Sequence, residues 1–255
     1  MRDILSEAVG SNPDPVRVAA QSAKAHLPKR FYKRAEAVPM ETGYELRLDD
    51  RPARTPGRSP VVAPSSRIGA AIAAEWNAQD ERIDPVTMPL TRTLNSAIDG
   101  VAPRMDEVRQ DVLAFARSDL LCYRADDPER LVRRQEEHWE PVLQRFAGEG
   151  ATFTLATGVM PVEQPHDALE RVRTTLEDEN SPLALAALHV ATTITGSALL
   201  AVAVRRQWIA PDAAWNAAHV DEDWNVELWG EDEEATLRRA ERRRDYDAAA
   251  FILLD

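Results

Sequence analysis

ETGYELRLD, residues 41–49, decides the fold of the amino-terminal part of the chain. Tyr44, Leu46 and Leu48 alternate with charged residues, which is the period of a strand that buries one face. Glu41-Thr42-Gly43, directly before them, is typical of a turn. The segment 31–63 therefore predicts a small antiparallel sheet.

A helix is expected after the sheet. Ser65 is suited to cap it, and Ile68 and Ile72 give it an apolar side that extends to Trp76, with an end near Gln79. Trp76 has two interpretations: a large side chain that closes the helix onto the sheet, or an exposed contact for another protein.

Residues 74–99, AEWNAQDERIDPVTMPLTRTLNSAID, mix side chains that no packing pattern demands, yet they contain no catalytic set. Residues 88–91 are interpreted as an extended joint, and residues 95–99 as the start of a new element. We interpret the whole stretch as the connection between two domains.

Prolines divide the chain, because 11 of the 17 lie at or before Pro103. Proline is tolerated in turns and edge strands but not inside helices, so the later part is expected to be helical. The predicted fold class is α+β. We expect an amino-terminal extension (1–29), a small antiparallel-sheet domain with one helix (30–100) and a larger all-helical domain (101–255).

Several helix boundaries follow from single residues. Asp127-Pro128 predicts a helix start with a capping carboxylate and a proline in the first turn. Pro141 removes a backbone donor, so a break is expected near Glu140.

Residues 183–204 carry no formally charged side chain apart from a possible proton on His189. Their length would suit a membrane span, but alanine and threonine dominate the segment. A single long helix enclosed by other helices is the preferred interpretation, and a membrane-attached factor is an alternative.

One apolar stripe predicts a single helix that ends at Gly230 in the left-handed conformation. Its members lie three or four residues apart: Ala213, Ala217, Val220, Trp224 and Leu228. The last helix then opens with residues 231–234, which are all acidic, and continues into arginines, an order that matches the helix dipole.

Composition narrows the function classes. With 43 acidic and 31 basic side chains the net charge is −12, which opposes contact with nucleic acid or anionic lipid. The lone Cys122 cannot form an internal disulfide, and its apolar neighbours predict a buried side chain in a reducing compartment. The first 29 residues resemble neither a secretory signal nor a transit peptide, so we expect a cytoplasmic protein without stable membrane insertion.

Known catalytic patterns are mostly missing from the sequence. The ten glycines give no phosphate-binding loop, and Thr195-Gly196-Ser197 lacks the setting of a nucleophile elbow. His219 and Glu222 have a spacing that can place an imidazole and a carboxylate on one metal, but no second pair exists. We expect no catalytic residue, metal or cofactor, and keep a small metal-dependent hydrolase that uses His219 and Glu222 as an alternative.

The segment 221–234 holds eight acidic residues and no basic one, with Trp224 and Trp229 interleaved. One interpretation is a solvated helix edge that aids solubility. The other is a docking surface for a basic partner, in which Trp229 is the better anchor because Trp224 lies on the apolar stripe.

The order and spacing of several blocks resemble one family. In the amino-terminal half they are Phe31-Tyr32-Lys33, Leu48-Asp49-Asp50-Arg51-Pro52, Ala74-Glu75-Trp76 and Met88-Pro89-Leu90-Thr91. In the carboxyl-terminal half they are Ser118 to Arg124, Gln135 with Trp139, Thr195-Gly196-Ser197 and Asp221-Glu222 through Trp229-Gly230. They resemble the ATP synthase assembly chaperones that bind the alpha subunit of the soluble catalytic sector.

The resemblance implies a two-domain protein without catalysis. It implies that Glu222, Glu227, Trp229 and Gly230 bind the partner, to which we add Trp76. It also implies that the chain holds an unassembled alpha subunit until the beta subunit displaces it. Asp50 departs from the family, which more often has glycine in that turn, so a different hairpin type is expected. The expected bacterial origin follows from the missing presequence.

Overall fold

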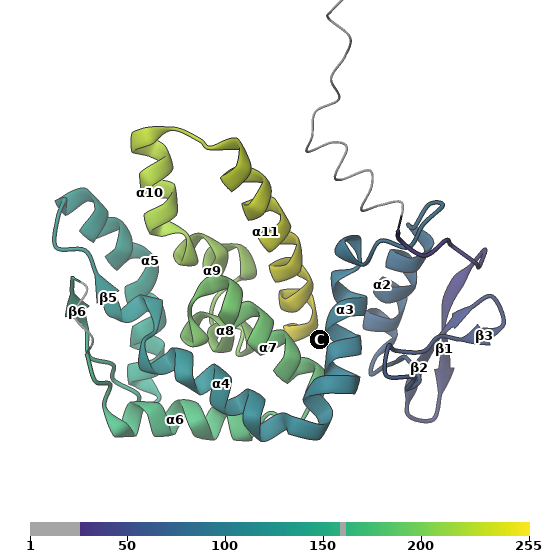
Figure 1. Ribbon diagram of the computed structural model, residues 1–255. Helices are drawn as coiled ribbons and strands as arrows, with labels where there is room; N and C mark the ends of the chain where they lie inside the picture. The colour runs from purple at the N-terminus through teal and green to yellow at the C-terminus, as the bar shows by residue number, and fades with distance from the viewer. Residues whose placement is uncertain (1–25, 159–161) are drawn as a thin grey trace, which may run out of the picture.

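The computed structural model describes residues 26–158 and 162–255. Figure 1 shows two parts side by side: a small sheet with helix α2, and a larger group of helices, with α3 between them. This arrangement confirms the predicted α+β class. The expected amino-terminal extension lies almost wholly outside the described residues, and the domain boundaries stay a prediction.

Four short strands form the expected antiparallel sheet, with β2 (Gly43–Leu48) at its centre. Strand β2 pairs with β1 (Ala35–Met40) along its whole length, and with β3 (Arg51–Pro52) and β4 (Val62–Ala63) on its other edge. Leu46 and Leu48 are buried, as the alternation predicted.

In the turn between β2 and β3, an aspartate takes the backbone conformation that glycine often adopts. Asp49, rather than Asp50, takes the positive φ of 52°. The Asp49 carboxylate accepts hydrogen bonds from the backbone N–H groups of Lys33 and Arg34, both at 3.0 Å. These bonds lower the pKa of Asp49 and hold the turn against the segment that precedes β1.

Helix α2 (Ser66–Asn77) packs against the sheet, and the Ser65 hydroxyl accepts from the Ile68 N–H at 3.2 Å, which confirms the predicted cap. Gly69 lies where the helix approaches the strands most closely. A Cβ at this position would lie 2.9 Å from the Cβ of Ala37 and 3.1 Å from that of Tyr44.

The expected extended joint at residues 88–91 is wrong, because helix α3 (Pro89–Ser96) begins there. Pro89 occupies the first turn, where a missing N–H costs nothing. The Glu75 carboxylate, on α2, accepts hydrogen bonds from the N–H groups of Leu90 and Thr91 at 2.7 and 2.8 Å. The expected new element over residues 95–99 is found only in part, because it begins at Ala97. Residues 95–99 end α3 and enter a π-helical turn, η2 (Ala97–Val101).

The connection between α2 and α3 is held by Gln79 and a short 3-10 turn, η1 (Pro85–Thr87). The buried Gln79 side chain accepts from the Asp84 N–H at 2.7 Å and donates to the Thr87 hydroxyl at 3.0 Å. Glu75 and Gln79 therefore give residues 74–99 their particular composition, because both side chains bind backbone at the joint.

The helical part begins with a 3-10 turn, η3 (Ala102–Arg104), and α4 (Met105–Arg117). Next come η4 (Leu120–Cys122) and β5 (Tyr123–Arg124), which pairs in parallel with β6 (Ala156–Thr157). Two expectations for α5 (Glu129–Gly148) are wrong. Pro128 is extended and takes the cap position, so Asp127 lies one residue too early to cap. The helix also continues through Pro141, which is exposed, so that water can satisfy the unpaired carbonyl.

Helix α6 (His166–Glu177) leads to α7 (Pro182–Thr195) and α8 (Ala198–Arg205). The expected single helix over 183–204 is wrong, because Gly196 has a φ of +69° and Ser197 caps a new helix. Both α7 and α8 are largely buried among other helices, as predicted. Within the described ranges, no helix has both the length and the apolar character to cross a bilayer.

The predicted apolar stripe also covers two helices, α9 (Pro211–Ala218) and α10 (Val220–Trp229). His219 interrupts the helix between them, so the helical phase changes there. Ala217, Val220 and Trp224 are buried, but Ala213 and Leu228 are exposed. Helix α11 (Glu233–Leu253) follows, and the Asp232 carboxylate accepts from the Ala235 N–H at 2.8 Å to cap it.

Candidate partner-binding site

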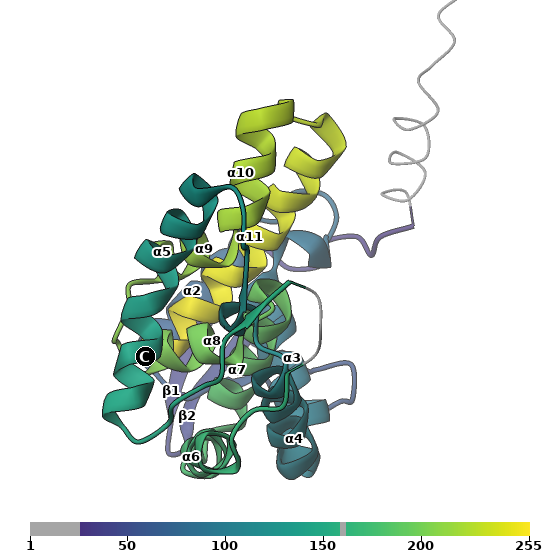
Figure 2. The ribbon, with the colours of Figure 1, turned by 90° about the vertical axis from the view of Figure 1, so that its left-hand side faces the viewer.

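Most of the residues predicted to bind a partner lie on the hairpin of α10 and α11, which projects at the top of Figure 2. Trp229 is 84% exposed, and its neighbour Leu228 is 55% exposed. Leu237, one turn into α11, is 63% exposed. Several exposed apolar side chains on one hairpin indicate an interaction surface more strongly than isolated exposed apolar residues do.

Gly230 ends α10 as expected, and its N–H donates to the Val226 carbonyl at 2.9 Å. Its φ is +85° and its ψ is 174°, so the predicted left-handed helical conformation is wrong. This combination suits glycine alone, since a Cβ would clash with the backbone itself. The turn directs the chain from α10 into α11 and leaves Trp229 at the tip.

Much of the acidic segment 221–234 is committed to contacts within the molecule. Asp221 accepts from Gln135 Nε2 at 2.8 Å, and Asp223 pairs with Arg239 Nη1 at 2.6 Å. These bonds tie α10 to α5 on one side and to α11 on the other. The like charges of the segment are therefore partly neutralised. This observation does not decide between a solvated helix edge and a docking surface.

Glu227 is the most connected of the predicted site carboxylates. It pairs with Arg130 at 3.2 Å and with Arg134 at 2.5 Å, both on α5. The Arg130 guanidinium also lies 5.3 Å from the centre of the Trp224 ring. We call the contacts of Glu227 with these two arginines the clasp. Because α10 buries only Val220 and Trp224, its polar contacts with α5 and α11, the clasp among them, help to position this helix.

Glu222 stands beside His219. Its carboxylate lies 3.8 Å from His219 Nε2, and its side chain is 40% exposed. His219 is buried, stacks on Trp215 at 3.9 Å between ring centres, and contacts the Trp215 carbonyl through Nδ1 at 2.8 Å. Burial lowers the pKa of His219, so a neutral ring is favoured.

The alternative of a metal-dependent hydrolase finds no support at His219 and Glu222. Among residues 26–158 and 162–255, no three histidine, cysteine or acidic side chains are grouped so that they could hold a metal ion. His219 is also engaged in packing against Trp215.

Sequence reasoning missed a buried polar cluster formed by Asp119 and Ser197. Asp119 accepts from the Ser197 hydroxyl at 2.6 Å, from the Leu199 N–H at 3.1 Å and from the Leu121 N–H at 3.2 Å. Burial raises the pKa of Asp119 to about 6, although these donors oppose the shift. The cluster lies far from the α10–α11 hairpin in sequence and fixes the corner between α7 and α8.

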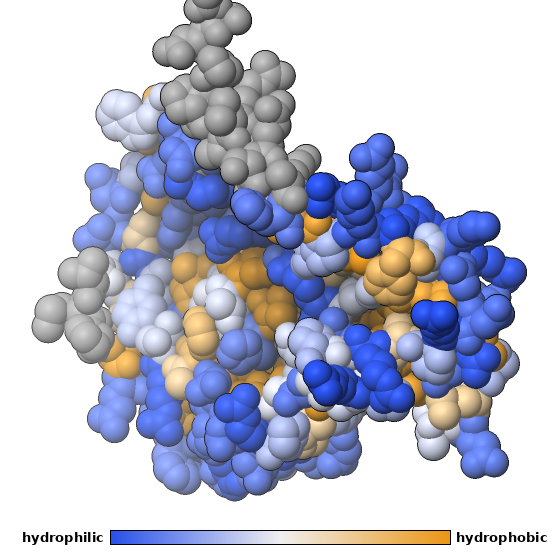
Figure 3. All heavy atoms as spheres, turned by 45° about the vertical axis from the view of Figure 1, so that its right-hand side comes forward, coloured by the Kyte–Doolittle hydropathy of each residue, from blue (hydrophilic) through white to orange (hydrophobic). Residues whose placement is uncertain are grey.

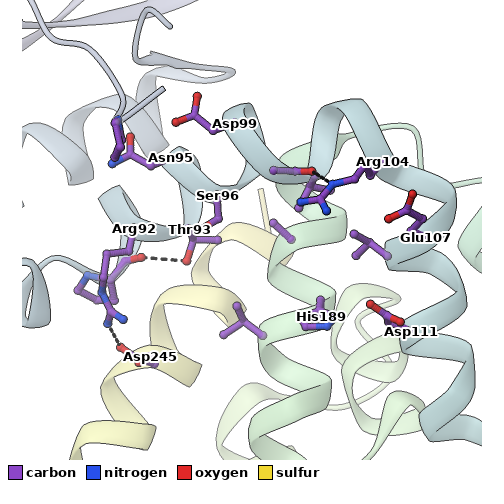
Figure 4. Close-up of a pocket in the computed structure, with 17 residues that line it drawn as sticks. Arg92, Thr93, Asn95, Ser96, Asp99, Arg104, Glu107, Asp111, His189 and Asp245 are labelled. Carbon is purple, nitrogen blue, oxygen red and sulfur yellow. Dashed lines mark hydrogen bonds and ion pairs between the residues drawn. The ribbon is translucent and has the colours of Figure 1, made fainter. Parts of the chain in front are cut away.

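A groove lies where the two parts of the molecule meet, and Figure 4 shows it at close range. It has a volume of about 660 Å³ and is lined by α3, η2, η3, α4, α7 and α11, with Pro56 from the sheet part. Figure 3 shows orange, apolar surface recessed among blue, hydrophilic side chains on the face turned toward the viewer. No sequence pattern pointed to this groove, because its lining combines residues 89–111 with residues of α7, α11 and the loop at Pro56, which lie far apart in the sequence.

Comparisons with known proteins decide the family. A family model described as ATP12 chaperone protein matches residues 29–147. The crystal structure of Atp12 from Paracoccus denitrificans is 39% identical, with a TM-score of 0.79, and the match covers 88% of this chain and 97% of that one. The chain belongs to the ATP12 chaperone family.

Other solved structures agree with membership of the ATP12 family. Atu1473, a candidate chaperone from Agrobacterium tumefaciens, is 47% identical with a TM-score of 0.85, and the match covers 95% of this chain and 91% of that one. A mutant of the Paracoccus Atp12 is 38% identical, also with a TM-score of 0.79. These relatives are bacterial, and the resemblance read from the sequence is confirmed as to family.

Trp76, the fifth predicted partner residue, lies apart from the α10–α11 hairpin of this ATP12 family member. Its ring is partly buried and lies 5.5 Å from that of Tyr32, whose hydroxyl donates to the Trp76 carbonyl at 2.7 Å. The structure thus gives Trp76 a packing role between α2 and the segment before β1. Its contribution to partner binding stays a prediction.

Proposed function

We propose that this ATP12 family protein is an assembly chaperone of F-type ATP synthase that binds the unassembled alpha subunit. It protects the surface of the alpha subunit that later faces the beta subunit, until the beta subunit displaces it. A chaperone with this role needs an exposed contact surface of moderate affinity, since the complex must dissociate. The expected compartment is the cytoplasm.

The observation that carries the proposal is Trp229, 84% exposed at the tip of the α10–α11 hairpin in a chain of the ATP12 family. Tryptophan is enriched among the residues that dominate binding energy in interfaces. The neighbouring carboxylates give the contact a preference for a basic partner surface. Trp229 thus provides the apolar anchor, and Glu222 provides negative charge two turns earlier on α10. Glu227 contributes by holding α10 through Arg130 and Arg134.

Charge reversal of Glu222 tests the proposed site. Because the Glu222 side chain is 40% exposed, Glu222→Lys should leave the melting temperature nearly unchanged. It should weaken binding of the purified alpha subunit by about tenfold, as expected for loss and reversal of one charge pair. Binding is measured by titration calorimetry at low salt.

Asp178→Lys is the matched control, since Asp178 is an exposed acid at the end of α6 and changes the net charge equally. Trp229→Ala should also lose affinity without loss of stability. If Glu222→Lys and Asp178→Lys bind the alpha subunit equally well, the acidic site is wrong. If the wild-type protein does not bind the alpha subunit, the proposed function itself is wrong.

A further inference from the structure

The groove between the two parts of the molecule is distinct from the predicted partner-binding residues on α10. We propose that this groove receives a lysine or arginine side chain, with an adjacent apolar side chain, from an extended segment of the bound alpha subunit. The proposal rests on the proposed function, and it adds a second contact of defined chemistry.

The size and the floor of the groove suit such a segment. Its volume of about 660 Å³ lies within the range of 300–1,000 Å³ that is typical of ligand sites. The apolar part of the lining includes side chains of α4, α7 and the π-helical turn, together with two prolines: Val101, Val108, Ala186, Val190, Pro56 and Pro89. One or two apolar side chains can therefore be buried there.

The groove has a shape that the surrounding structure fixes. Asp99, in the π-helical turn η2, accepts from the Thr55 hydroxyl at 2.7 Å and from the Gly57 N–H at 2.8 Å. These bonds hold the loop between β3 and β4 against η2 at the edge of the groove. Such π-helical turns occur frequently at functional sites.

The charges of the groove are unbalanced once its internal pairs are counted. Arg92 is neutralised by Asp245 at 2.5 Å, and Asp99 is committed to its two donors. Glu107 and Asp111 remain, one turn apart on α4 and on the same face, where like charges repel each other. Figure 4 shows both carboxylates without an interaction to the other residues drawn.

Among the described residues that line the groove, Arg104 is the one arginine besides Arg92, and its Nε donates to the Gly100 carbonyl at 3.3 Å. His189 lines the groove from α7, near Asp111 in Figure 4. A cationic side chain between Glu107 and Asp111 would remove their mutual repulsion. The charge of the groove thus favours a basic side chain of the bound segment. Its apolar floor favours an apolar side chain next to that basic residue.

A cross-linking experiment tests the occupant directly. Ser96 is exposed and lines the groove, and the lone native Cys122 is fully buried. Ser96→Cys can therefore be labelled selectively with a benzophenone maleimide and irradiated together with the purified alpha subunit. We expect a cross-link to one segment of the alpha subunit that contains lysine or arginine beside an apolar residue. Leu228→Cys, on the α10–α11 hairpin, is labelled in parallel.

The two labelled positions separate the two proposals. A cross-link from position 228 without one from position 96 overturns the groove and leaves the proposed function intact. Cross-links from neither position overturn both. A cross-link from position 96 to a segment without a basic residue overturns the stated chemistry of the occupant.

A charge variant gives an independent readout. The double variant Glu107→Gln, Asp111→Asn should bind the alpha subunit about fivefold more weakly at low salt, which corresponds to two exposed charge pairs. The difference should shrink at high salt because the pairs are screened. Glu136→Gln, Glu137→Gln is the control, since these exposed acids lie on α5 outside the groove.

Equal binding by the two double variants would contradict the proposal. A second copy of this chain in the groove would instead give a concentration-dependent dimer in sedimentation, abolished by Glu107→Gln, Asp111→Asn, and this result would also overturn it.

Discussion

Asp119 is a carboxylate that the folded chain encloses completely. Its three hydrogen-bond donors come from η4 and from the start of α8, so the charge is partly compensated but not paired with a cation. Burial of an unpaired carboxylate favours its protonated form. The pKa of about 6 therefore makes this residue a source of pH-dependent stability between about pH 4 and 6.

The sign of this pH dependence follows from the raised pKa. Between the unfolded value near 3.8 and about 6, the folded chain binds more protons at Asp119 than the unfolded chain does. The contribution of Asp119 to the free energy of unfolding is therefore greatest below pH 4. It falls by about 3 kcal/mol as the pH rises through 6.

Asp119→Asn should remove this contribution. The unfolding free energy is measured by urea denaturation. We expect the wild type to lose stability relative to the variant steadily as the pH rises from 4 to 6. The amide also places a donor near the Leu199 N–H, so the variant should lose about 1–3 kcal/mol at pH 5. A difference that is constant over this pH range would contradict the assignment of the raised pKa to Asp119.

At the scale of elements, Gly69 sets the distance between α2 and the sheet. Gly69→Ala would bring a methyl group within 2.9 Å of the Ala37 Cβ and 3.1 Å of the Tyr44 Cβ. Overpacking of this kind costs about 1–3 kcal/mol, and the higher helix propensity of alanine returns at most about 1 kcal/mol. Thermal unfolding should therefore show a net loss of stability.

Gly148→Ala is the matched control for this prediction. Gly148 lies in the last turn of α5, and a Cβ there meets no atom within 4 Å. The substitution should be neutral or slightly stabilising. If both variants gain stability, the close approach of α2 to the sheet is not a constraint.

The sheet was predictable from the sequence because its evidence is local. The alternation of Tyr44, Leu46 and Leu48 lies within one strand, and Ser65 caps the next helix directly. The start of α3 was not predictable in this way, because its capping acceptor is Glu75, fifteen residues earlier on another helix. The helix breaks at Gly196 and His219 were hidden by apolar spacings that continue across them.

The candidate site was predictable only in part. Family resemblance and the position of Trp229 outside the apolar stripe pointed to the segment that forms the α10–α11 hairpin. The arginine partners of Glu227 lie more than 90 residues away in sequence, and no spacing rule connects them. The groove and the Asp119 cluster likewise depend on contacts between distant segments.

At the scale of the whole molecule, the clasp controls how firmly α10 is held. Glu227→Gln removes the charge shared by two partly exposed ion pairs, so the free energy of global unfolding should change by less than about 1 kcal/mol. Hydrogen exchange of the α10 backbone amides should nevertheless become several-fold faster, because this helix buries only two residues.

Glu129→Gln is the control for the clasp. Glu129 also pairs with an arginine, Arg133, but both residues lie on α5 and the pair ties no second element. The variant should leave α10 exchange unchanged. Equal exchange rates in the two variants would show that the clasp does not position α10.

The cluster of Asp119 and Ser197 has a consequence for synthesis on the ribosome. Asp119 meets its donors from Ser197 and Leu199 only after 78 to 80 further residues have been made. At bacterial or eukaryotic rates this interval lasts roughly 4–16 s. During it the Asp119 carboxylate stays hydrated, and the apolar face of α4 has no α7 to cover it. A chain of this chaperone family therefore spends seconds of its own biogenesis with unprotected apolar surface.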